Sequence, residues 1–275
     1  MRSFGNFLRL MYEFLRRDAR IALSYRLQFF FQVSSVLSVA VTFFFVSLMM
    51  RDVERLIPSL ARYGGGYLGF VLVGIAFSSY LNAALQTFAS AIRQAQMTGT
   101  LEAMLSTKTR IGPLVAGSAV YPLSVTTFRS VLFLASGTLL GVQFHVDRVG
   151  VALLVLGLTV ASTMVLGIFS AGFIVLFKQG DPLTAAIGGL SWLLSGILYP
   201  KEILPGWVQR IADLLPMTHT LEAMRLLLLA GAPPSAVVSA LVYLGGFALV
   251  GIPIAVLWFG WAVERARIDG SLAKY

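Results

Sequence analysis

The sequence predicts an all-α membrane protein with six transmembrane helices, an N-terminal amphipathic interface helix, and re-entrant or interfacial helices between the fifth and sixth spans. Hydrophobic residues make up 57 % of the 275 residues and charged residues only 12 %, whereas soluble domains carry about 25 % charged residues. Several uncharged runs also reach the roughly 20 residues that a helix needs to cross a bilayer. The runs are continuous rather than alternating, which favours helices over the strands of a membrane β-barrel.

Six stretches define a predicted transmembrane domain over residues 27–263. We expect the spans at about residues 27–50, 64–92, 122–144, 149–177, 183–200 and 235–263. Pro113 and Pro122 punctuate the third stretch, so residues 111–121 are expected near the cytoplasmic interface and Arg129 near the inner boundary of the membrane. There Arg129 either snorkels to lipid headgroups or is an intramembrane charge at a subunit seam.

The distribution of basic residues predicts the orientation. An even number of spans places both termini on one side, and the segments on that side hold fourteen Lys and Arg residues, against seven on the other side. By the positive-inside rule, the side of the termini is cytoplasmic. We therefore expect a multi-pass protein of the plasma (inner) membrane with both termini in the cytoplasm, the second of them as a tail over residues 264–275. The basic residues are scattered between apolar runs, which argues against binding of nucleic acid.

Residues 1–26 form the predicted interface helix. Apolar residues recur there at helical spacing, and arginines occupy the other face. Such a helix lies at the cytoplasmic membrane surface, with its apolar side in the acyl boundary and its arginines near anionic headgroups. It serves either as a lipid anchor alone or as an interface that also touches a soluble subunit.

The cytoplasmic loop over residues 93–110 is predicted to contain a short capped helix. Gly99 offers a break, Thr100 can cap the helix that follows, and Glu102 falls in the first turn, where a negative charge suits the helix dipole. A short apolar stripe on this helix consists of Leu101, Met104 and Leu105. The stripe either packs on its own protein or fills a groove on a partner.

Residues 201–231 are predicted to form the re-entrant or interfacial helices at the outer leaflet. Prolines cut this segment into pieces that are too short and too charged to span a membrane, yet too apolar for a solvated loop. The segment either plugs the outer end of the bundle or forms an outer gate for substrate. The candidate gate residues are Tyr199, Pro200, Glu202, Pro205, Trp207, Pro216, His219, Glu222 and Arg225.

Polar residues without charge and a tryptophan mark one side of three predicted spans. They are Ser38 and Thr42 in the first span, Ser78, Asn82 and Gln86 in the second, and Ser191, Trp192 and Ser195 in the fifth. These faces either line a pathway between paired subunits for an amphipathic substrate or pack helices against one another.

The sequence excludes several kinds of chemistry. It contains no cysteine, and no G-x-x-x-x-G-K-[ST] loop that could cradle the phosphates of ATP. Its two histidines, His145 and His219, lie far apart, which argues against a metal site, and His219 is expected to make a surface or gate contact near Glu222. No acidic residue interrupts the predicted spans, which argues against an ion-driven carrier and against an intramembrane hydrolase.

Several segments resemble a known family in their order and spacing. Residues Gly99 to Leu105 look like the coupling segment of the type-2 permeases of ATP-binding-cassette (ABC) transporters. The signature that this family carries before its last span is similar to Tyr199-Pro200, Leu204-Pro205, Leu215-Pro216-Met217-Thr218 and Glu222-Ala223-Met224-Arg225. The resemblance implies the permease subunit of an exporter and implies that the helix at Leu101 to Leu105 docks on a cytoplasmic ATPase.

The implied assembly contains two permeases, either copies or paralogues, and two ABC ATPase subunits within a lipid membrane. ATP and Mg²⁺ would bind to the ATPase subunits, so no cofactor is expected on this chain. The family's substrates include drugs, lipids, glycolipids and lipid-linked polysaccharides. Two other functions stay open from the sequence: a membrane scaffold that anchors an ATPase without transport, and a membrane-embedded enzyme that modifies lipids.

Overall fold

The computed structural model of the chain describes residues 26–54, 58–64, 66–97, 111–177 and 182–268, and the structural statements below concern these residues. Over them the chain forms helices and turns without a strand, which confirms the predicted all-helical class. The helices, with 3-10 helices marked η, are α2 (Arg26–Glu54), α3 (Pro58–Ala61), α4 (Tyr67–Met97), α6 (Ile111–Leu139), η1 (Val146–Arg148), α7 (Val149–Phe177), α8 (Pro182–Leu194), η2 (Lys201–Ile203), α9 (Gly206–Ala212), α10 (Pro216–Leu228), η3 (Pro234–Val237) and α11 (Val238–Ile268).

Five of the described helices are long and apolar enough to cross a membrane. Their apolar stretches are Phe30–Met50 in α2, Tyr67–Ser90 in α4, Ala119–Leu139 in α6, Val146–Phe177 in η1 and α7, and Pro234–Ala266 in η3 and α11. They correspond to the first four predicted spans and to the sixth. The predicted fifth span is represented by α8, whose 13 residues cover only about 20 Å at 1.5 Å per residue. The count of six crossings therefore stays a prediction.

The third span differs from its prediction at both ends. Helix α6 is continuous from Ile111, and Pro122 lies inside this helix instead of at its start. Membrane helices tolerate an internal proline because neighbouring groups satisfy the freed carbonyl. The helix ends at Leu139, and Gly141 follows with a φ of +94°, a conformation that glycine adopts without strain. Arg129 lies eighteen residues after the start of α6 and ten before its end, which is deeper in the helix than a span that begins at Pro122 would place it.

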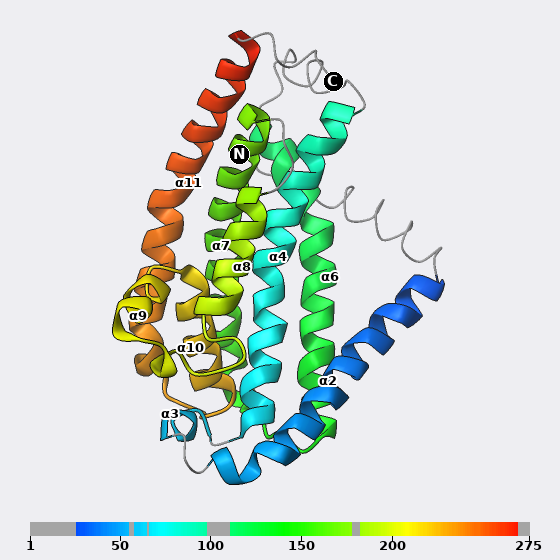
Figure 1. Ribbon diagram of the computed structural model, residues 1–275, viewed down its shortest axis with the longest axis vertical. Helices are drawn as coiled ribbons and strands as arrows, with labels where there is room; N and C mark the ends of the chain where they lie inside the picture. Colours follow the sequence, from blue (N-terminus) through cyan, green and yellow to red (C-terminus); the bar gives the residue numbers. More distant parts are fainter. Residues whose placement is uncertain (1–25, 55–57, 65, 98–110, 178–181, 269–275) are drawn as a thin grey trace.

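Helix α4 is the centre of the bundle. Helices α2, α6, α7, α8 and α10 all pack against it, while α11 lies along α7 (Figure 1). Helix α2 is tilted, and its first half diverges from the other helices (Figure 1). Its buried residues Val36 and Ala40 belong to the same apolar core as α4. We call the end of the bundle that holds α3, the start of α4 and the end of α6 the α3 end (Figure 1).

Hydroxyl groups bond across the contact between α4 and α6. Ser130 Oγ donates to the backbone oxygen of Ala76 at 2.8 Å, and the hydroxyl of Tyr80 donates to Oγ1 of Thr127 at 2.9 Å. Such hydrogen bonds between membrane helices contribute about 0.6–2 kcal/mol each. They fix the register of the two helices and thereby the depth of the neighbouring Arg129.

The chain turns after α8. Gly196 has a φ of +71°, a left-handed conformation that commonly ends a helix. Helix α9 begins directly after Pro205, and α10 begins at Pro216. Helix α10 packs against α4, α7 and α11. Both short helices lie in the half of the molecule nearer the α3 end (Figure 1).

Candidate functional site

A buried arginine joins three parts of the chain near the α3 end. Arg225 lies on α10 and is only 3 % exposed. Its Nε donates to the backbone oxygen of Phe70 on α4 at 3.2 Å, and its Nη2 donates to the backbone oxygen of Ile197, after α8, at 2.9 Å. The guanidinium carbon also lies 3.4 Å from the ring centroid of Phe70, which is a cation–π contact. Arg225 thus ties α10 to α4 and to the turn after α8.

Gly74 allows this turn to approach α4. A Cβ atom at position 74 would lie 2.3 Å from the backbone oxygen of Ile197 and 2.8 Å from Nη2 of Arg225. Any side chain would therefore push the turn away from the helix. Glycine is required here by the close approach of two backbone segments.

Arg225 has no carboxylate within ion-pair distance among the described residues. Burial lowers the pKa of Arg225 to about 9, and the more distant carboxylates of Glu202 and Glu222 oppose this shift. The side chain is therefore still a cation at neutral pH. Because a buried charge is costly unless hydrogen bonds satisfy it, the two carbonyl oxygens hold Arg225 in place, and Arg225 in turn holds them together.

Ion pairs connect the surface of this site. Glu222, one turn before Arg225, pairs with Arg62 at 3.0 Å and with Lys201 at 3.7 Å, and Lys201 pairs with Asp213 at 2.7 Å. These residues come from the segment before α4, from η2, from the end of α9 and from α10. Exposed ion pairs contribute up to about 1 kcal/mol each, so the network orients the segments more than it stabilises them.

His219 contacts Asp213 and Tyr243 and not the nearby carboxylate of Glu222. Its Nε2 lies 2.8 Å from the backbone oxygen of Asp213, and its ring stacks on Tyr243 of α11 with centroids 3.9 Å apart. The carboxylate of Glu222 turns instead to the two cations of the network. Arg62 and Lys201 bring full positive charges within ion-pair distance of that carboxylate.

The pKa of Tyr63 is sensitive to the burial and the charges of this site. Burial raises the pKa of Tyr63 to about 12, and the carboxylates of Glu222 and Glu202 act in the same direction. Since this value exceeds the ordinary 10.0, the neutral phenol contributes stability below pH 10 that is lost as the pH rises towards 12. The wild type should therefore lose thermal stability relative to Tyr63→Phe only above pH 10. A difference that stays constant through this alkaline range would contradict the burial of the phenol.

Four predicted gate residues shape the turns of this segment. Pro200 and Pro205 precede η2 and α9, and Pro216 is the first residue of α10. The hydroxyl of Tyr199 donates to the backbone oxygen of Leu193. These residues position the chain, and none of them contacts Arg225 in a hydrogen bond that the structure describes.

Helix α9 has one face towards the protein and one away from it. Val208 and Ala212 are buried, whereas Trp207 is 69 % exposed, together with Ile211 and Leu214. An exposed tryptophan beside aliphatic residues is typical of a membrane–water interface. Trp207 therefore belongs to the outside of the predicted gate segment rather than to its centre.

Exposure separates the predicted pathway residues into two groups. Ser38, Thr42, Asn82, Gln86 and Trp192 are exposed, whereas Ser78, Ser191 and Ser195 are buried. Asn82 and Gln86 differ from their surroundings, because α4 is otherwise the most buried of the five long helices. Helix α8 passes close by, since a Cβ atom at Gly188 would lie 3.7 Å from Oδ1 of Asn82. The exposed groups fit a polar pathway, and the buried serines fit helix packing.

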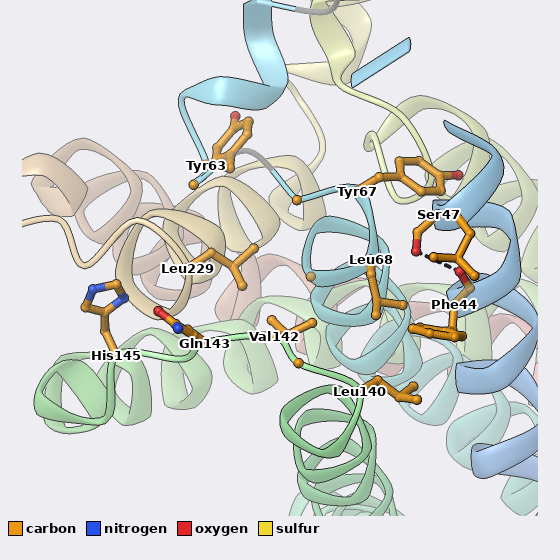
Figure 2. A pocket seen from close by; sticks show the side chains of 15 residues that line it. Phe44, Ser47, Tyr63, Tyr67, Leu68, Leu140, Val142, Gln143, His145 and Leu229 are labelled. Carbon is orange, nitrogen blue, oxygen red and sulfur yellow. Dashed lines mark hydrogen bonds between the residues drawn. The ribbon is translucent and has the colours of Figure 1, made fainter. Parts of the chain in front are cut away.

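An uncharged cavity of about 380 Å³ lies between α2 and the rest of the α3 end. Aliphatic side chains of Leu68, Val142 and Leu229 converge at its centre (Figure 2). Polar side chains stand at the margins, with Gln143 and His145 on one side and Ser47 and Tyr67 on the other (Figure 2). The volume lies in the range of small-molecule pockets, and an apolar centre with polar margins suits part of an amphipathic molecule.

The predicted coupling residues Gly99, Thr100, Leu101, Glu102, Met104 and Leu105 lie outside the described residues, and so does the predicted interface helix up to residue 25. Helix α4 extends to Met97, directly before them. In the described part of the chain, no group of three or more His, Asp or Glu side chains could hold a metal ion.

Three features of the site have no counterpart in the sequence predictions. Gly74 and Arg62 are far from the predicted gate in sequence, and the cavity is formed by residues from four separate segments. The sequence did contain a signal for Gly74, because an isolated glycine inside a helical pattern can mark a close approach of another segment.

Comparisons with known proteins agree with the membrane architecture. A sequence model described as ABC-2 type transporter matches residues 10–229. The match reaches from before α2 to the residue after α10, and it includes the predicted coupling segment, Gly74 and Arg225. A comparison with curated proteins finds no match.

Proposed function

The chain belongs to the ABC-2 type transporter family, and from this membership we propose that it is the permease subunit of an ATP-driven exporter. Family members are multi-pass membrane components of ABC transporters that normally work with ATP-binding subunits and are not themselves catalytic. The proposed cargo is an amphipathic molecule, such as a drug, a lipid, a glycolipid or a lipid-linked polysaccharide. It would leave the cytoplasm or the inner leaflet.

The observation that carries the proposal is the pattern of polarity along the long helices. Their apolar stretches contain acidic residues only near their ends, at Asp147 and Glu264, so they offer no carboxylate in mid-membrane for coupling to protons or sodium. Uncharged polar side chains, Asn82 and Gln86 among them, are nevertheless exposed there. An energy source on another chain and a pathway for cargo with few hydrogen-bonding groups fit this pattern.

The proposed assembly contains two permeases, as copies or paralogues, with two ATPase subunits that bind ATP and Mg²⁺. Helix α2 exposes large side chains along its length, including Phe30, Phe31 and Phe45 at 60–65 %, which supports contacts with a second permease and with lipid. We propose that the segment with α8 makes the fifth crossing and that residues 201–231 form re-entrant or interfacial helices at the outer leaflet, which gives six crossings. Both termini would then lie in the cytoplasm, as the basic residues indicate.

Purification of the chain from its native membrane tests the proposal against its alternatives. An ATPase that copurifies, and whose activity rises when a panel of lipids and amphipathic drugs is added, supports the exporter. An ATPase that copurifies but does not respond to any of them supports a scaffold. Absence of an ATPase, with chemical conversion of an added lipid, supports a membrane-embedded enzyme.

A bulky side chain on the exposed face of α4 should block the pathway. Asn82→Trp is expected to reduce the stimulation of ATPase activity by cargo about tenfold or more, because the indole occupies space that cargo needs, while the complex still assembles. Leu249→Trp is the matched control, since Leu249 on α11 is 78 % exposed on a purely apolar face. Equal stimulation in both variants would remove Asn82 from the pathway.

A further inference from the structure

Arg129 lies deep within an apolar helix. Helix α6 runs from Ile111 to Leu139 with no other charge, and Arg129 is eighteen residues after its first residue and ten before its last, or about 15 Å from the nearer end. Its neighbours Thr127 and Ser130 bond to Tyr80 and Ala76, which lie near the middle of the uncharged run 63–92 of α4 and the residues before it. A run of this length exceeds the roughly 20 residues that cross a bilayer, so Arg129 lies near mid-depth. An arginine side chain extends about 6–7 Å from its Cα over five bonds. This length is too short for the guanidinium to snorkel to the headgroups.

The described part of the chain offers Arg129 no partner. Its Nε is buried without a hydrogen-bond partner, and it takes part in none of the ion pairs among the described residues. Its neighbours on α6 are engaged elsewhere, because Thr127 bonds to Tyr80 and Ser130 to the backbone of Ala76. The charge is thus held at mid-depth without compensation from α4.

A second copy of the chain would not supply the missing negative charge from these spans. Asp147 is the second residue of the stretch Val146–Phe177, and Glu264 is the third from the end of Pro234–Ala266. The other described apolar stretches contain no acidic residue. The described apolar stretches thus hold no carboxylate at the depth of Arg129, and an anionic molecule that enters the membrane would bring one.

We infer that Arg129 binds an anionic group, a phosphate or carboxylate, on the amphipathic cargo as it passes the middle of the membrane. The inference rests on the proposed function and narrows its substrate class. A guanidinium presents its donors in one plane and matches the geometry of an oxyanion. Charged side chains inside membranes are rare and typically mark substrate pathways. Arg129 would thus select anionic over zwitterionic cargo.

Thiol labelling tests the environment of Arg129 without any transport assay. The natural chain has no cysteine, so a single Leu132→Cys, one helical turn from Arg129, reports on that position alone. In the purified complex an anionic methanethiosulfonate should react about tenfold faster than a cationic one, because the guanidinium attracts it. Arg129→Gln should bring this ratio close to one, and Arg129→Lys should preserve it. Leu249→Cys, on the exposed apolar face of α11, should stay unlabelled.

Protection by defined amphiphiles tests the cargo itself. Lysophosphatidylglycerol should slow the labelling of Leu132→Cys at about tenfold lower concentration than lysophosphatidylcholine of equal chain length, and Arg129→Gln should abolish the difference. Inorganic phosphate should not protect, since the bound anion is part of an amphiphile. Labelling by neither reagent, equal protection by both lipids, or protection by phosphate alone would each overturn the inference. Labelling needs no ATP hydrolysis, so the absence of an ATPase would refute the proposed function separately.

Discussion

Gly74→Ala should destabilise the protein strongly. The new Cβ would lie 2.3 Å from the backbone oxygen of Ile197, and a backbone atom cannot swing away as a side chain end can. The turn after α8 has to move off α4, which lengthens the 2.9 Å hydrogen bond from Arg225 to Ile197. Overpacking of this kind costs about 1–3 kcal/mol, or more where a buried bond is lost as well.

The matched control is Gly157→Ala in α7, where a Cβ atom meets nothing within 4 Å. Alanine is favoured over glycine inside a helix by up to about 1 kcal/mol, so this variant should keep or raise the thermal unfolding midpoint in detergent. Gly74→Ala should lower it by several degrees. Equal midpoints for the two variants would show that the turn does not pack against α4 as described.

Leu101→Asp should uncouple ATP hydrolysis from transport. The prediction follows from the resemblance of Gly99 to Leu105 to a coupling segment, in which Leu101 and Met104 would lie in an apolar groove of the ATPase. A carboxylate forced into such a groove costs several kcal/mol, which corresponds to a loss of about a hundredfold or more in affinity. Stimulation of the ATPase by cargo should disappear, and the transmembrane helices should stay folded.

Ser106→Asp is the matched control for this variant, because it adds the same charge in the same segment but off the apolar stripe of Leu101, Met104 and Leu105. The Ser106→Asp variant should still bind the ATPase, and cargo should still stimulate ATP hydrolysis. Met104→Asp should behave like Leu101→Asp. Wild-type ATPase binding and stimulation in both stripe variants would contradict docking through this stripe.

Helix boundaries were predictable where a charged residue ends the apolar run. They were not predictable where a glycine with positive φ ends the helix. Helix α7, Val149–Phe177, has the same bounds as the predicted fourth span, 149–177, because Arg148 and Lys178 bound an uninterrupted apolar run. Helix α6 ends before Gly141 and α8 ends before Gly196, both of which have positive φ. Neither glycine differs in sequence from those inside helices, so composition alone extended both spans too far.

The candidate site depends on contacts between distant segments, which spacing along the chain does not reveal. Arg225 was identified as a gate residue, but its partners Phe70 and Ile197 lie on other elements. His219 was expected near Glu222 as a surface or gate contact, and tertiary packing brings the distant Arg62 to that carboxylate. The chemistry of each residue was predictable from its type, whereas the choice of partner was set by the fold.

Cross-linking in the assembled complex tests most directly whether an ATPase docks on the predicted coupling loop, residues 93–110, of this permease. A photoreactive side chain placed at Leu101, with Ser106 as the control position, should form a covalent adduct with a copurified chain that binds and hydrolyses ATP. The yield should be several times higher at Leu101 than at Ser106. A complex that hydrolyses ATP and responds to cargo, yet gives no adduct at Leu101, would contradict the account.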